Sequence, residues 1–417
     1  MDILFVVPYV PDLIRVRPYN LIRHLTMRGQ RITVMTLYSS EAERQSAEAL
    51  REHCSEVVAL ELPKWRSLAN AAAALSRRVP MQADYCWLPI LAEQIEAAIW
   101  PDKSAGRASF DIVHVEHLRG ARYGHRIQSR FNQDGRTQLP IVWDSVDSIT
   151  HLFRQSSASS KKILSRLLAR FELALTEKHE AVLASIFDHM LVTSKKDRDA
   201  FLDLPGIRKD PQHIHVLPNG VDLDYFTPDN TTKREAKNLV ISGKMSYHAN
   251  VSMVLYFVNQ ILPLIRKRHP DVKVTIVGKD PPRGILALAQ DPNIVVTGTV
   301  ADIRPYLRRA VVAIAPLTYG AGIQNKILEA MACETPVVTT SRAISALEVQ
   351  SGVELLTAAE EVDFANGVCR LLDDPALREQ IGRNGRAYVE RSHNWMKVAA
   401  QLEGIYEEAC SNLLKQP

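Results

Sequence analysis

The sequence predicts an α/β protein with two Rossmann-like domains, each built on its own doubly wound parallel sheet. Short β-branched runs alternate with longer helical patterns along all 417 residues, which is typical of βαβ units. This length is too great for one hydrophobic core, because single domains usually contain about 100 to 200 residues. Residues 218–232 are rich in turn formers and lack a helical or strand period, so they separate the two sheets.

The expected strands are short apolar, β-branched runs bounded by turn formers. In the first half they are residues 3–7, 32–37, 57–60, 112–115, 141–143 and 189–193. In the second half they are residues 238–242, 273–277, 294–297, 311–315, 336–339 and 353–356. Each half is therefore expected to form its own sheet.

These elements give the expected domain boundaries. The first domain covers residues 1–220, a linker covers 221–237, the second domain covers 238–391, and a helix in 392–417 returns to the first domain. Two such sheets that face each other leave a cleft at the carboxyl ends of their strands, where open α/β sheets bind ligands. The functional residues are expected there.

Composition excludes several classes of protein. Hydrophobic residues make up 46% and charged residues 24%, and no apolar run approaches the roughly 18 to 20 residues of a membrane-spanning helix. The apolar run 3–7 stops at Pro8 and lacks a cationic start, so we interpret it as a buried strand rather than a leader. Five scattered cysteines without a CxxC pair favour a reducing cytoplasm over a disulfide framework or a zinc site.

The charge is also informative. A net charge of +4 does not indicate a nucleic-acid binder. Residues 1–220 hold 29 Lys and Arg against 25 Asp and Glu, so the whole excess lies in the first half. Part of it lies in residues 119–170, which include the basic amphipathic stretch 161–171. Peripheral contact with the inner face of a membrane and a core-packed helix with a solvated outer face both fit this pattern.

The most informative segment is residues 315–338. A strand ends there, a loop with Gly320 and Gly322 follows, and a helix then begins, whose free backbone N–H groups form an anion site. Lys326 lies in the first turn of that helix, where a cation is unfavourable for the helix dipole and so indicates a ligand of opposite charge. Glu329, one turn later, can accept hydrogen bonds from a pair of sugar hydroxyls. The glycines alone are weak evidence.

Taken as a unit, this segment resembles the donor-binding motif of family 4 glycosyltransferases, E-G-F-G-x-P-x-x-E-A-M-A-x-G-x-P-V. Residues 329–332 and 336–338 match it closely. Residues 216–228 resemble the hinge motif of that family, I-P-N-G-V-D-x-x-x-F-x-P, and residues 296–303 resemble its G-x-V-x-D element. The variant G-I-x-N-K-x-L-E-A-M-A is similar to that of sugar transferases from exopolysaccharide clusters.

The resemblance implies the GT-B fold, with an acceptor-binding first domain and a donor-binding second domain. It implies retaining transfer of a hexose-type sugar from a UDP, GDP or dTDP sugar to a glycan, lipid-linked or small-molecule acceptor. It also implies that no metal or other cofactor is required. In that mechanism cationic side chains and backbone N–H groups stabilise the departing diphosphate, and no protein nucleophile is needed.

The second half of this chain departs from the family pattern at four positions. The first glutamate of the family motif falls at Ala321, and its phosphate-binding Arg and Lys fall at Lys244 and Ala249. Lys326 stands where the usual motif has proline. We expect Lys326 to replace the charge lost at Ala249, because two phosphates need about two cations for charge-assisted hydrogen bonds.

The first half contains a second candidate region. Residues 110–117 resemble the D-V-V-H-x-H strand end of the family, whose second histidine contacts the donor sugar, and here Glu116 takes that position with His117 one step later. Side chains alternate faces along a strand, so both point the same way only if the strand has ended. The residue that faces the donor is therefore left open.

Four further side chains are acceptor-binding candidates. Asp144 and Asp147 lie at i and i+3 after an expected strand, where they can bind hydroxyls or cap the next helix. Arg15 and Arg17 lie in the first loop, where each faces an anionic group or solvent.

The complete assignment has three classes. Catalytic candidates are Glu116, His117, Lys244 and Lys326. Donor-binding candidates are Gly243, Lys244, Gly278, Val300, Gly320, Gly322, Ile323, Gln324, Asn325, Lys326 and Glu329. Acceptor-binding candidates are Arg15, Arg17, Asp144 and Asp147, and no metal ligands are expected.

Other functions compete with glycosyl transfer. A nucleotide-sugar epimerase or an NAD-dependent dehydrogenase also uses Rossmann-like sheets, but no G-x-G-x-x-G follows the first strand, as a dinucleotide fold requires. A non-catalytic nucleotide-binding partner is the third alternative, because Ala321 lacks the motif carboxylate. Turnover with a sugar donor separates this alternative from an enzyme.

Overall fold

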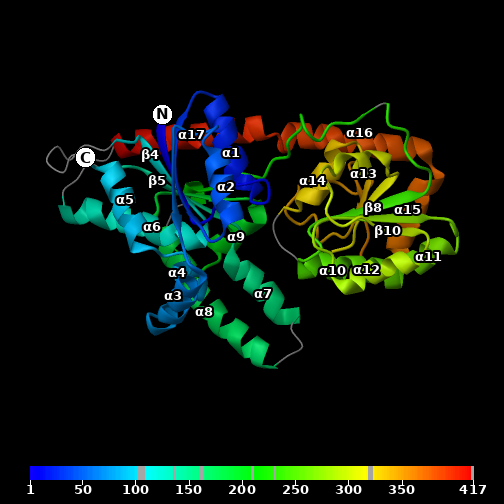
Figure 1. Ribbon diagram of the computed structural model, residues 1–417, viewed down its shortest axis with the longest axis horizontal. Coiled ribbons are helices and arrows are strands. Elements are labelled where there is room, and N and C mark those ends of the chain that lie inside the picture. The colour runs from blue at the N-terminus through cyan, green and yellow to red at the C-terminus, as the bar shows by residue number, and fades with distance from the viewer. Residues whose placement is uncertain are drawn as a thin grey trace. The chain divides into compact units, whose positions relative to one another are not determined.

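The chain forms two compact units (Figure 1). The computed structural model describes residues 1–101, 109–134, 138–159, 163–207, 211–229, 231–317 and 323–414. The first unit consists of Met1–Leu217 and Trp395–Pro417, and the second of Pro218–Asn394. The chain therefore passes from the first unit to the second and returns once.

The first unit is built on a parallel sheet. Its described residues form seven strands in the order β3-β2-β1-β4-β5-β6-β7. These strands are β1 (Asp2–Val7), β2 (Arg31–Tyr38), β3 (Glu56–Glu61), β4 (Ile112–Glu116), β5 (Ile141–Val146), β6 (His189–Val192) and β7 (Ile214–Val216). All registered pairs are parallel, as the βαβ pattern predicts.

Helices connect these strands and supply the rest of the core. They are α1 (Val16–Met27), α2 (Glu41–Leu50), α3 (Lys64–Ser76), α4 (Met81–Asp84), α5 (Pro89–Ile99), α6 (His117–Asp134), α7 (Ile149–Ser159), α8 (Ile163–Ile186), α9 (Lys195–Leu202) and α17 (Trp395–Leu414), with the single turn η1 (Pro211–His213). Helix α17, coloured red, lies beside α1, coloured blue (Figure 1). Leu402 and Tyr406 of α17 pack with Leu21 and Leu25 of α1 in one buried cluster. Residues close to the C-terminus thus complete the core of the first unit.

The second unit has a parallel sheet of its own. Its described residues form six strands in the order β10-β9-β8-β11-β12-β13. The strands are β8 (Asn238–Ser242), β9 (Lys273–Val277), β10 (Ile294–Val296), β11 (Val312–Ala315), β12 (Val337–Thr339) and β13 (Leu356–Thr357). The helices are α10 (His248–Tyr256), η2 (Phe257–Ile261), α11 (Leu262–Arg266), α12 (Arg283–Leu286), η3 (Ala287–Gln290), α13 (Arg304–Arg309), α14 (Asn325–Ala332), α15 (Glu361–Asp373) and α16 (Pro375–Ser392). The two-sheet α/β class predicted from the sequence is confirmed.

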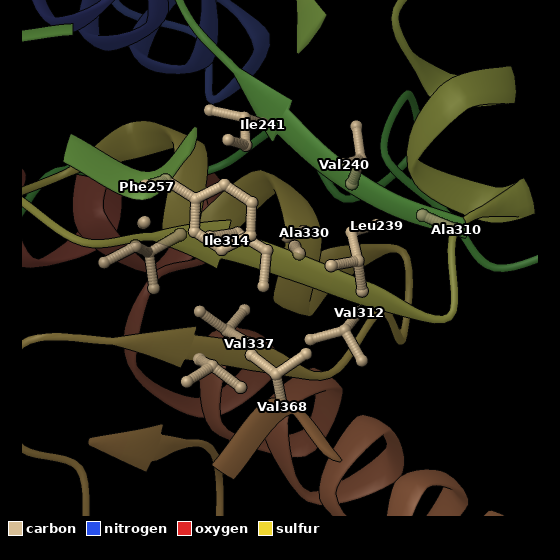
Figure 2. Close-up of a cluster of buried hydrophobic side chains, with 14 of the residues drawn as sticks. Leu239, Val240, Ile241, Phe257, Ala310, Val312, Ile314, Ala330, Val337 and Val368 are labelled. Atoms are coloured by element: carbon tan, nitrogen blue, oxygen red, sulfur yellow. The ribbon is translucent and has the colours of Figure 1, made fainter. Parts of the chain in front are cut away.

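The central strands of the second unit are buried on both faces. Figure 2 shows side chains of β8, β11 and β12 packed with Phe257 and with Ala330 and Val368 from the helices. Every residue of β8 and β11 is buried. Such strands form continuous apolar runs because helices cover both faces of a parallel sheet.

The segment expected as a linker, residues 221–237, is part of the second unit. The Val221 N–H donates to the His393 carbonyl at 2.7 Å, and Arg234 donates to the Ala310 and Glu334 carbonyls at 2.7 and 2.8 Å. The boundary between the units falls just before Pro218 instead. Val221, Leu223 and Phe226 also pack on the core of the second unit, so polar and apolar contacts together hold this irregular segment in place.

Two strands differ from the expectation. β7 is absent from the expected set, because three residues are too few for a recognisable alternation. The last strand is expected at 353–356 but is formed by Leu356–Thr357, since the Gly352 N–H donates to the Leu355 carbonyl and closes a turn at 2.7 Å. The other expected strands agree with the structure to within a few residues at each end.

One helical run in the described residues, His248–Arg266, has the length and hydropathy of a membrane-spanning segment. It is formed by α10, η2 and α11, and 44% of its most apolar window is buried inside the protein. Its buried side chains, among them Met253, Phe257 and Ile265, belong to the core of the second unit. Core packing therefore accounts for its apolar composition.

Candidate active site

The first candidate site lies in the second unit, beyond the carboxyl ends of β8 and β11. In the sheet, β8 lies between β9 and β11, so successive connections run toward opposite edges on either side of this strand pair. Open α/β sheets bind ligands at such a topological switch point. Gly243 directly follows β8, and α14 is the helix that follows β11. The predicted donor-binding residues of the second unit come from these two connections and their neighbours.

Two predicted glycines allow close backbone packing here. A Cβ atom on Gly278 would lie 1.7 Å from the Gly243 carbonyl oxygen, which is closer than any real contact. A Cβ atom on Gly243 would lie 2.8 Å from Asn250 Nδ2, and Gly243 has φ 145°, which favours glycine. Both positions therefore require glycine for packing around the site.

Lys326 and Asn250 join the two connections. Lys326 is the second residue of α14, and its Nζ donates to Asn250 Oδ1 at 2.6 Å. Asn250 lies in the first turn of α10, is 5% exposed, and donates from Nδ2 to the Lys244 carbonyl at 2.9 Å. A Cβ atom on Gly243 would lie 3.4 Å from Lys326 Cε. These four residues thus form one cluster, which we call the lysine cluster.

Burial shifts the pKa values of Lys326, in the lysine cluster, and of Glu329 beside it. Burial lowers the pKa of Lys326 to about 8, although the nearby Glu329 carboxylate opposes the shift. Burial raises the pKa of Glu329 to about 7, against the attraction of Lys326. Lys326 and Glu329 are three residues apart and share one face of α14. An anion bound here would hold Lys326 in its charged form.

The residue next to position 249, rather than position 249 itself, contacts Lys326. Ala249 is buried, with 3% exposure, whereas Lys244 is exposed and contributes its carbonyl to the lysine cluster. The side chain that Lys326 meets belongs to Asn250, which the sequence argument does not identify. The sequence signal that could have identified Asn250 is its position: it is a polar residue in the first turn of the helix that follows Gly243 and Lys244.

The remaining donor candidates have varied environments. Ile323 is buried, Gln324 precedes the first turn of α14, and Asn325 begins it. Asn325 Oδ1 is buried without a hydrogen-bond partner among the described residues. Val300 is partly buried against the core of the second unit. Gly320, Ala321 and Gly322 lie outside the described residues.

The first unit has its own switch point between β1 and β4. Glu116 ends β4 and is 1% exposed. Its Oε1 accepts from the Tyr9 hydroxyl at 3.5 Å, and its Oε2 lies 3.4 Å from His114 Nε2. Burial, with repulsion from Asp144, raises the pKa of Glu116.

His117 begins α6 with φ 63°, so the strand has ended and alternation no longer separates it from Glu116. It is partly exposed, whereas Glu116 is buried. The Arg119 N–H donates to His117 Nδ1 at 3.3 Å, and burial lowers the pKa of His117 to about 4. The ring is thus neutral, and its proton is on Nε2.

Two acceptor candidates form a buried ion pair instead of presenting their charges to a ligand. Arg17 Nε lies 2.8 Å from Asp144 Oδ2, and the side chains are 4% and 0% exposed. Arg17 Nη1 also donates to the Leu217 carbonyl at 3.0 Å, and Asp144 Oδ1 accepts from the Val146 N–H at 3.0 Å. The polar sequence around these residues gives no sign that they pair across 127 positions.

Asp144 of this pair also belongs to a group of three residues of metal-ligand types. Ligand atoms of His114, Glu116 and Asp144 lie within 4.8 Å of one another, and all three residues are buried. Each already has a protein partner: Arg17 pairs with Asp144, Glu116 Oε2 lies 3.4 Å from His114 Nε2, and His114 Nδ1 lies 2.8 Å from the Tyr406 hydroxyl. The geometry fits an internal hydrogen-bond network that links α1, β4, β5 and α17.

The other two acceptor candidates have polar partners but remain partly exposed. Arg15 pairs with Glu43 at 2.8 Å, and its guanidinium lies 4.9 Å from the centre of the Tyr9 ring. Asp147 Oδ1 accepts from the Thr193 hydroxyl at 2.9 Å. Burial and the nearby Asp197 raise the pKa of Asp147 to about 6.

Arg15 lines a cavity of about 370 Å³ beside the first switch point. The cavity lies beyond β1 and β2 and against α3, and it combines three cations with aromatic rings. Its lining is Pro8, Tyr9, Arg15, Leu37, Tyr38, Ser39, Glu43, Leu62, Lys64, Ser67, Leu68, Tyr85, Cys86 and Arg119. The arrangement suits an anionic ligand with an apolar or sugar portion.

The basic segment 119–170 is only partly described, and the side chains of 161–169 lie outside the described residues. Within α6, Arg122 pairs with Asp84 at 2.7 Å and Arg126 with Glu96 at 2.5 Å. Both arginines also approach the Trp87 ring. These two cations thus contribute to packing within the first unit.

Sequence relatives identify the chemistry of the fold. The profile of the family described as "Glycosyl transferases group 1" matches residues 236–374, which contain the lysine cluster. The chain thus contains a domain of the group 1 glycosyltransferase type. It is 26% identical to the MMP alpha-(1->4)-mannosyltransferase of Mycolicibacterium hassiacum over 320 residues, which cover 74% of this chain and 72% of that protein.

Two further likenesses extend over nearly the whole chain. An uncharacterized 44.6 kDa protein in the cps region of Klebsiella pneumoniae is 22% identical over 389 residues, 91% of this chain and 92% of that protein. The crystal structure of Anabaena Alr3699/HepE in complex with UDP and glucose has a TM-score of 0.66 at 15% identity and covers 98% of this chain and 99% of that one. The GT-B fold predicted from the motifs is confirmed.

Proposed function

We propose that the protein is a retaining transferase that moves a hexose-type sugar from a UDP, GDP or dTDP sugar to an acceptor. The observation that carries the proposal is the lysine cluster, which brings a buried amine, two helix starts and close-packed glycines together at the switch point of the second unit. The structural neighbour HepE is described with UDP and glucose, which supports a nucleotide-sugar donor.

In this proposal Lys326 and Lys244 supply the positive charge that the departing diphosphate needs. Backbone N–H groups of Gly322 and Ile323, which precede α14 in the sequence, add donors, and the start of α14 adds a favourable dipole. Glu329, one turn further along α14, accepts hydrogen bonds from donor hydroxyls. The acceptor hydroxyl attacks from the face that the nucleotide leaves, and a phosphate oxygen takes its proton.

The acceptor is proposed to bind to the first unit. The cavity of about 370 Å³ presents Arg15, Lys64 and Arg119 with several tyrosine rings, so it fits a glycan, a lipid-linked or a small acceptor with an anionic group. His117, whose ring centre lies 6.1 Å from that of Tyr9, is the nearest candidate to contact the donor sugar from this side. Cytoplasmic location, with peripheral membrane contact through 119–170, completes the proposal.

The decisive experiment combines turnover with stereochemistry. The protein is incubated with UDP, GDP and dTDP hexoses and a panel of acceptors, and proton NMR follows the anomeric configuration of the product. We expect turnover with one of the donors in the presence of EDTA, with release of its nucleoside diphosphate. The transferred sugar in the product should keep the anomeric configuration that it has in the donor. An inverted product would overturn retention, and activity that requires Mg²⁺ or Mn²⁺ would overturn the role given to the lysines.

A Glu329→Gln variant tests the donor site directly. The loss of hydrogen bonds to a charged acceptor typically costs about 1.5 to 3 kcal/mol, so donor binding should weaken while the fold persists. Unchanged donor affinity in the folded variant would remove Glu329 from the site.

A further inference from the structure

The second unit also contains a polar cavity, at the opposite ends of its strands from the lysine cluster. Its volume is about 440 Å³, and its lining is Pro228, Asp229, Thr232, Arg234, Arg308, Cys333, Glu334, Pro336, Arg378, Glu379 and Arg383. Arg234 donates to the carbonyls of Ala310 and Glu334, which lie two and three residues before β11 and β12, respectively. The cavity therefore lies at the amino ends of these strands, whereas the lysine cluster lies beyond their carboxyl ends.

Backbone carbonyls fix three of its arginines in position. Arg234 Nη1 donates to Ala310 at 2.7 Å and Nη2 to Glu334 at 2.8 Å. Arg308 Nε donates to the Thr227 carbonyl at 2.7 Å, and Arg378 Nη1 donates to the Leu371 carbonyl at 2.9 Å. Because each guanidinium is held by neutral oxygens, its charge is positioned but not neutralised.

The acidic residues of the lining balance these charges only in part. Asp229 accepts from the hydroxyls of Thr231 and Thr232 at 2.6 Å each, and Glu379 pairs with the fourth arginine, Arg383, at 3.6 Å. Among the residues that the structure describes, no carboxylate forms an ion pair with Arg234, Arg308 or Arg378. The lining thus holds four arginines against three carboxylates, which leaves one positive charge in excess.

We propose that this cavity, the arginine cavity, binds a phosphorylated small molecule and is separate from the donor site. Three preoriented guanidinium groups suit the oxygens of a phosphate dianion, to which arginine binds in a planar, bidentate manner. Burial lowers the pKa of Arg234, and a bound anion would relieve this cost. The volume exceeds that of a bare phosphate, and Glu334 and Thr232 offer partners for hydroxyl groups, so a sugar phosphate fits the chemistry better than inorganic phosphate.

Calorimetric titration of the full chain with glucose 6-phosphate, glucose and inorganic phosphate tests the proposal. We expect glucose 6-phosphate to bind most tightly, inorganic phosphate more weakly and glucose not at all. The variant Arg308→Gln/Arg378→Gln should weaken binding of both phosphates at least roughly tenfold, because it removes two charge-assisted contacts. Inorganic phosphate that binds as tightly as the sugar phosphate would assign the site to free phosphate and overturn the sugar-phosphate assignment.

A matched control is Arg283→Gln/Arg309→Gln, which removes the same charge from exposed positions of the second unit outside the cavity. It should leave affinity within about twofold of the wild type. Lys326→Met, which alters the proposed donor site, should also leave glucose 6-phosphate affinity unchanged. Failure of the donor proposal therefore leaves this one intact, and the reverse also holds.

Three results would overturn the proposal: no binding of either phosphate to the wild type, equal weakening by the control pair, or loss through Lys326→Met with normal binding by the cavity variant. Thermal unfolding without ligand checks the fold of each variant. If the double variant does not fold, Arg378→Gln alone keeps the test open, because that side chain makes one hydrogen bond, to Leu371, in the structure. That single variant should still weaken the binding of glucose 6-phosphate.

Discussion

Lys326 Nζ lies 2.6 Å from Asn250 Oδ1, and this one contact joins the first turns of α14 and α10. A lysine at a helix start opposes the helix dipole, so an amide oxygen that accepts from it lowers the cost of its position. An ammonium group has three donors, and Asn250 accepts from one of them. The contact thus orients the side chain and leaves donors for phosphate oxygens at the switch point of the sheet.

Lys326→Met is therefore expected to weaken binding of the nucleoside diphosphate and its sugar, but not of the free nucleoside. The loss of a charge-assisted hydrogen bond costs about 1.5 to 3 kcal/mol, which corresponds to roughly 10- to 150-fold in the dissociation constant. Lys326→Arg should retain part of the affinity, because it keeps the charge with a different shape. Isothermal titration with the three ligands measures the difference.

The control for this prediction is Lys267→Met, which removes the same charge from an exposed position on the second unit. It should leave all three affinities unchanged. Equal losses for the nucleoside and the diphosphate in Lys326→Met would show that the residue supports the fold and does not contact phosphate.

Diphosphate affinity should also fall as pH rises through about 8. Burial lowers the pKa of Lys326 to about 8, so the free protein carries this charge below that pH and loses it above. Because only the protonated amine attracts the anion, affinity should decline toward about tenfold per pH unit above the pKa. Titrations between pH 7.5 and 9.5 avoid Glu329, whose raised pKa of about 7 lies below this window. Lys326→Arg should show no such decline, and a flat wild-type profile would contradict the assignment.

The glycine contact between Gly278 and Gly243 predicts a structural result. Gly278→Ala places a methyl group where the Gly243 carbonyl lies, so the connection after β8 must move. Overpacking of this kind typically costs about 1 to 3 kcal/mol, and donor affinity should fall with stability. Gly284→Ala is the control, because it adds a methyl group in open space on α12. Urea unfolding compares the two, and equal midpoints would contradict the packing argument.

Local patterns predict the sheets and the main site better than they predict the contacts. The strands β8 and β9 have the expected bounds, since each is a short segment rich in β-branched and apolar residues. Lys326 is identified from its place behind a glycine loop. Its partner Asn250 is not, because 76 residues separate the two and only the parallel pairing of β8 with β11 brings their helices together.

Two acceptor candidates show where sequence patterns assign a binding role that the structure does not support. Arg17 and Asp144 are polar residues near expected strand ends, which is where ligand-binding groups are sought. The structure instead places them in contact with each other, with 4% and 0% side-chain exposure. Burial of a charged residue depends on the rest of the fold, so a single sequence offers no local signal that separates an internal ion pair from a binding site.

This ion pair supports the last prediction, which concerns the stability of the first unit. Asp144→Leu leaves the Arg17 guanidinium buried without its carboxylate, and removal of one partner of a buried pair typically costs about 3 to 5 kcal/mol. Arg17→Met leaves Asp144 beside Glu116 and should cost a similar amount. Because each single variant leaves one buried charge without its partner, and the double variant leaves neither, Arg17→Met/Asp144→Leu should be more stable than the sum of the two losses implies.

Urea unfolding of the wild type, both single variants and the double variant measures this coupling. The exposed pair Arg44–Glu41, with side-chain exposures of 51% and 62%, provides the control, and its single variants should leave the unfolding midpoint unchanged because solvent screens the pair. Additive losses at Arg17 and Asp144 would mean that their contact contributes nothing beyond the separate burial of each side chain. If the single variants proved fully stable but lost acceptor binding, both residues would return to the acceptor site, and the ion pair would be a partner that the acceptor displaces.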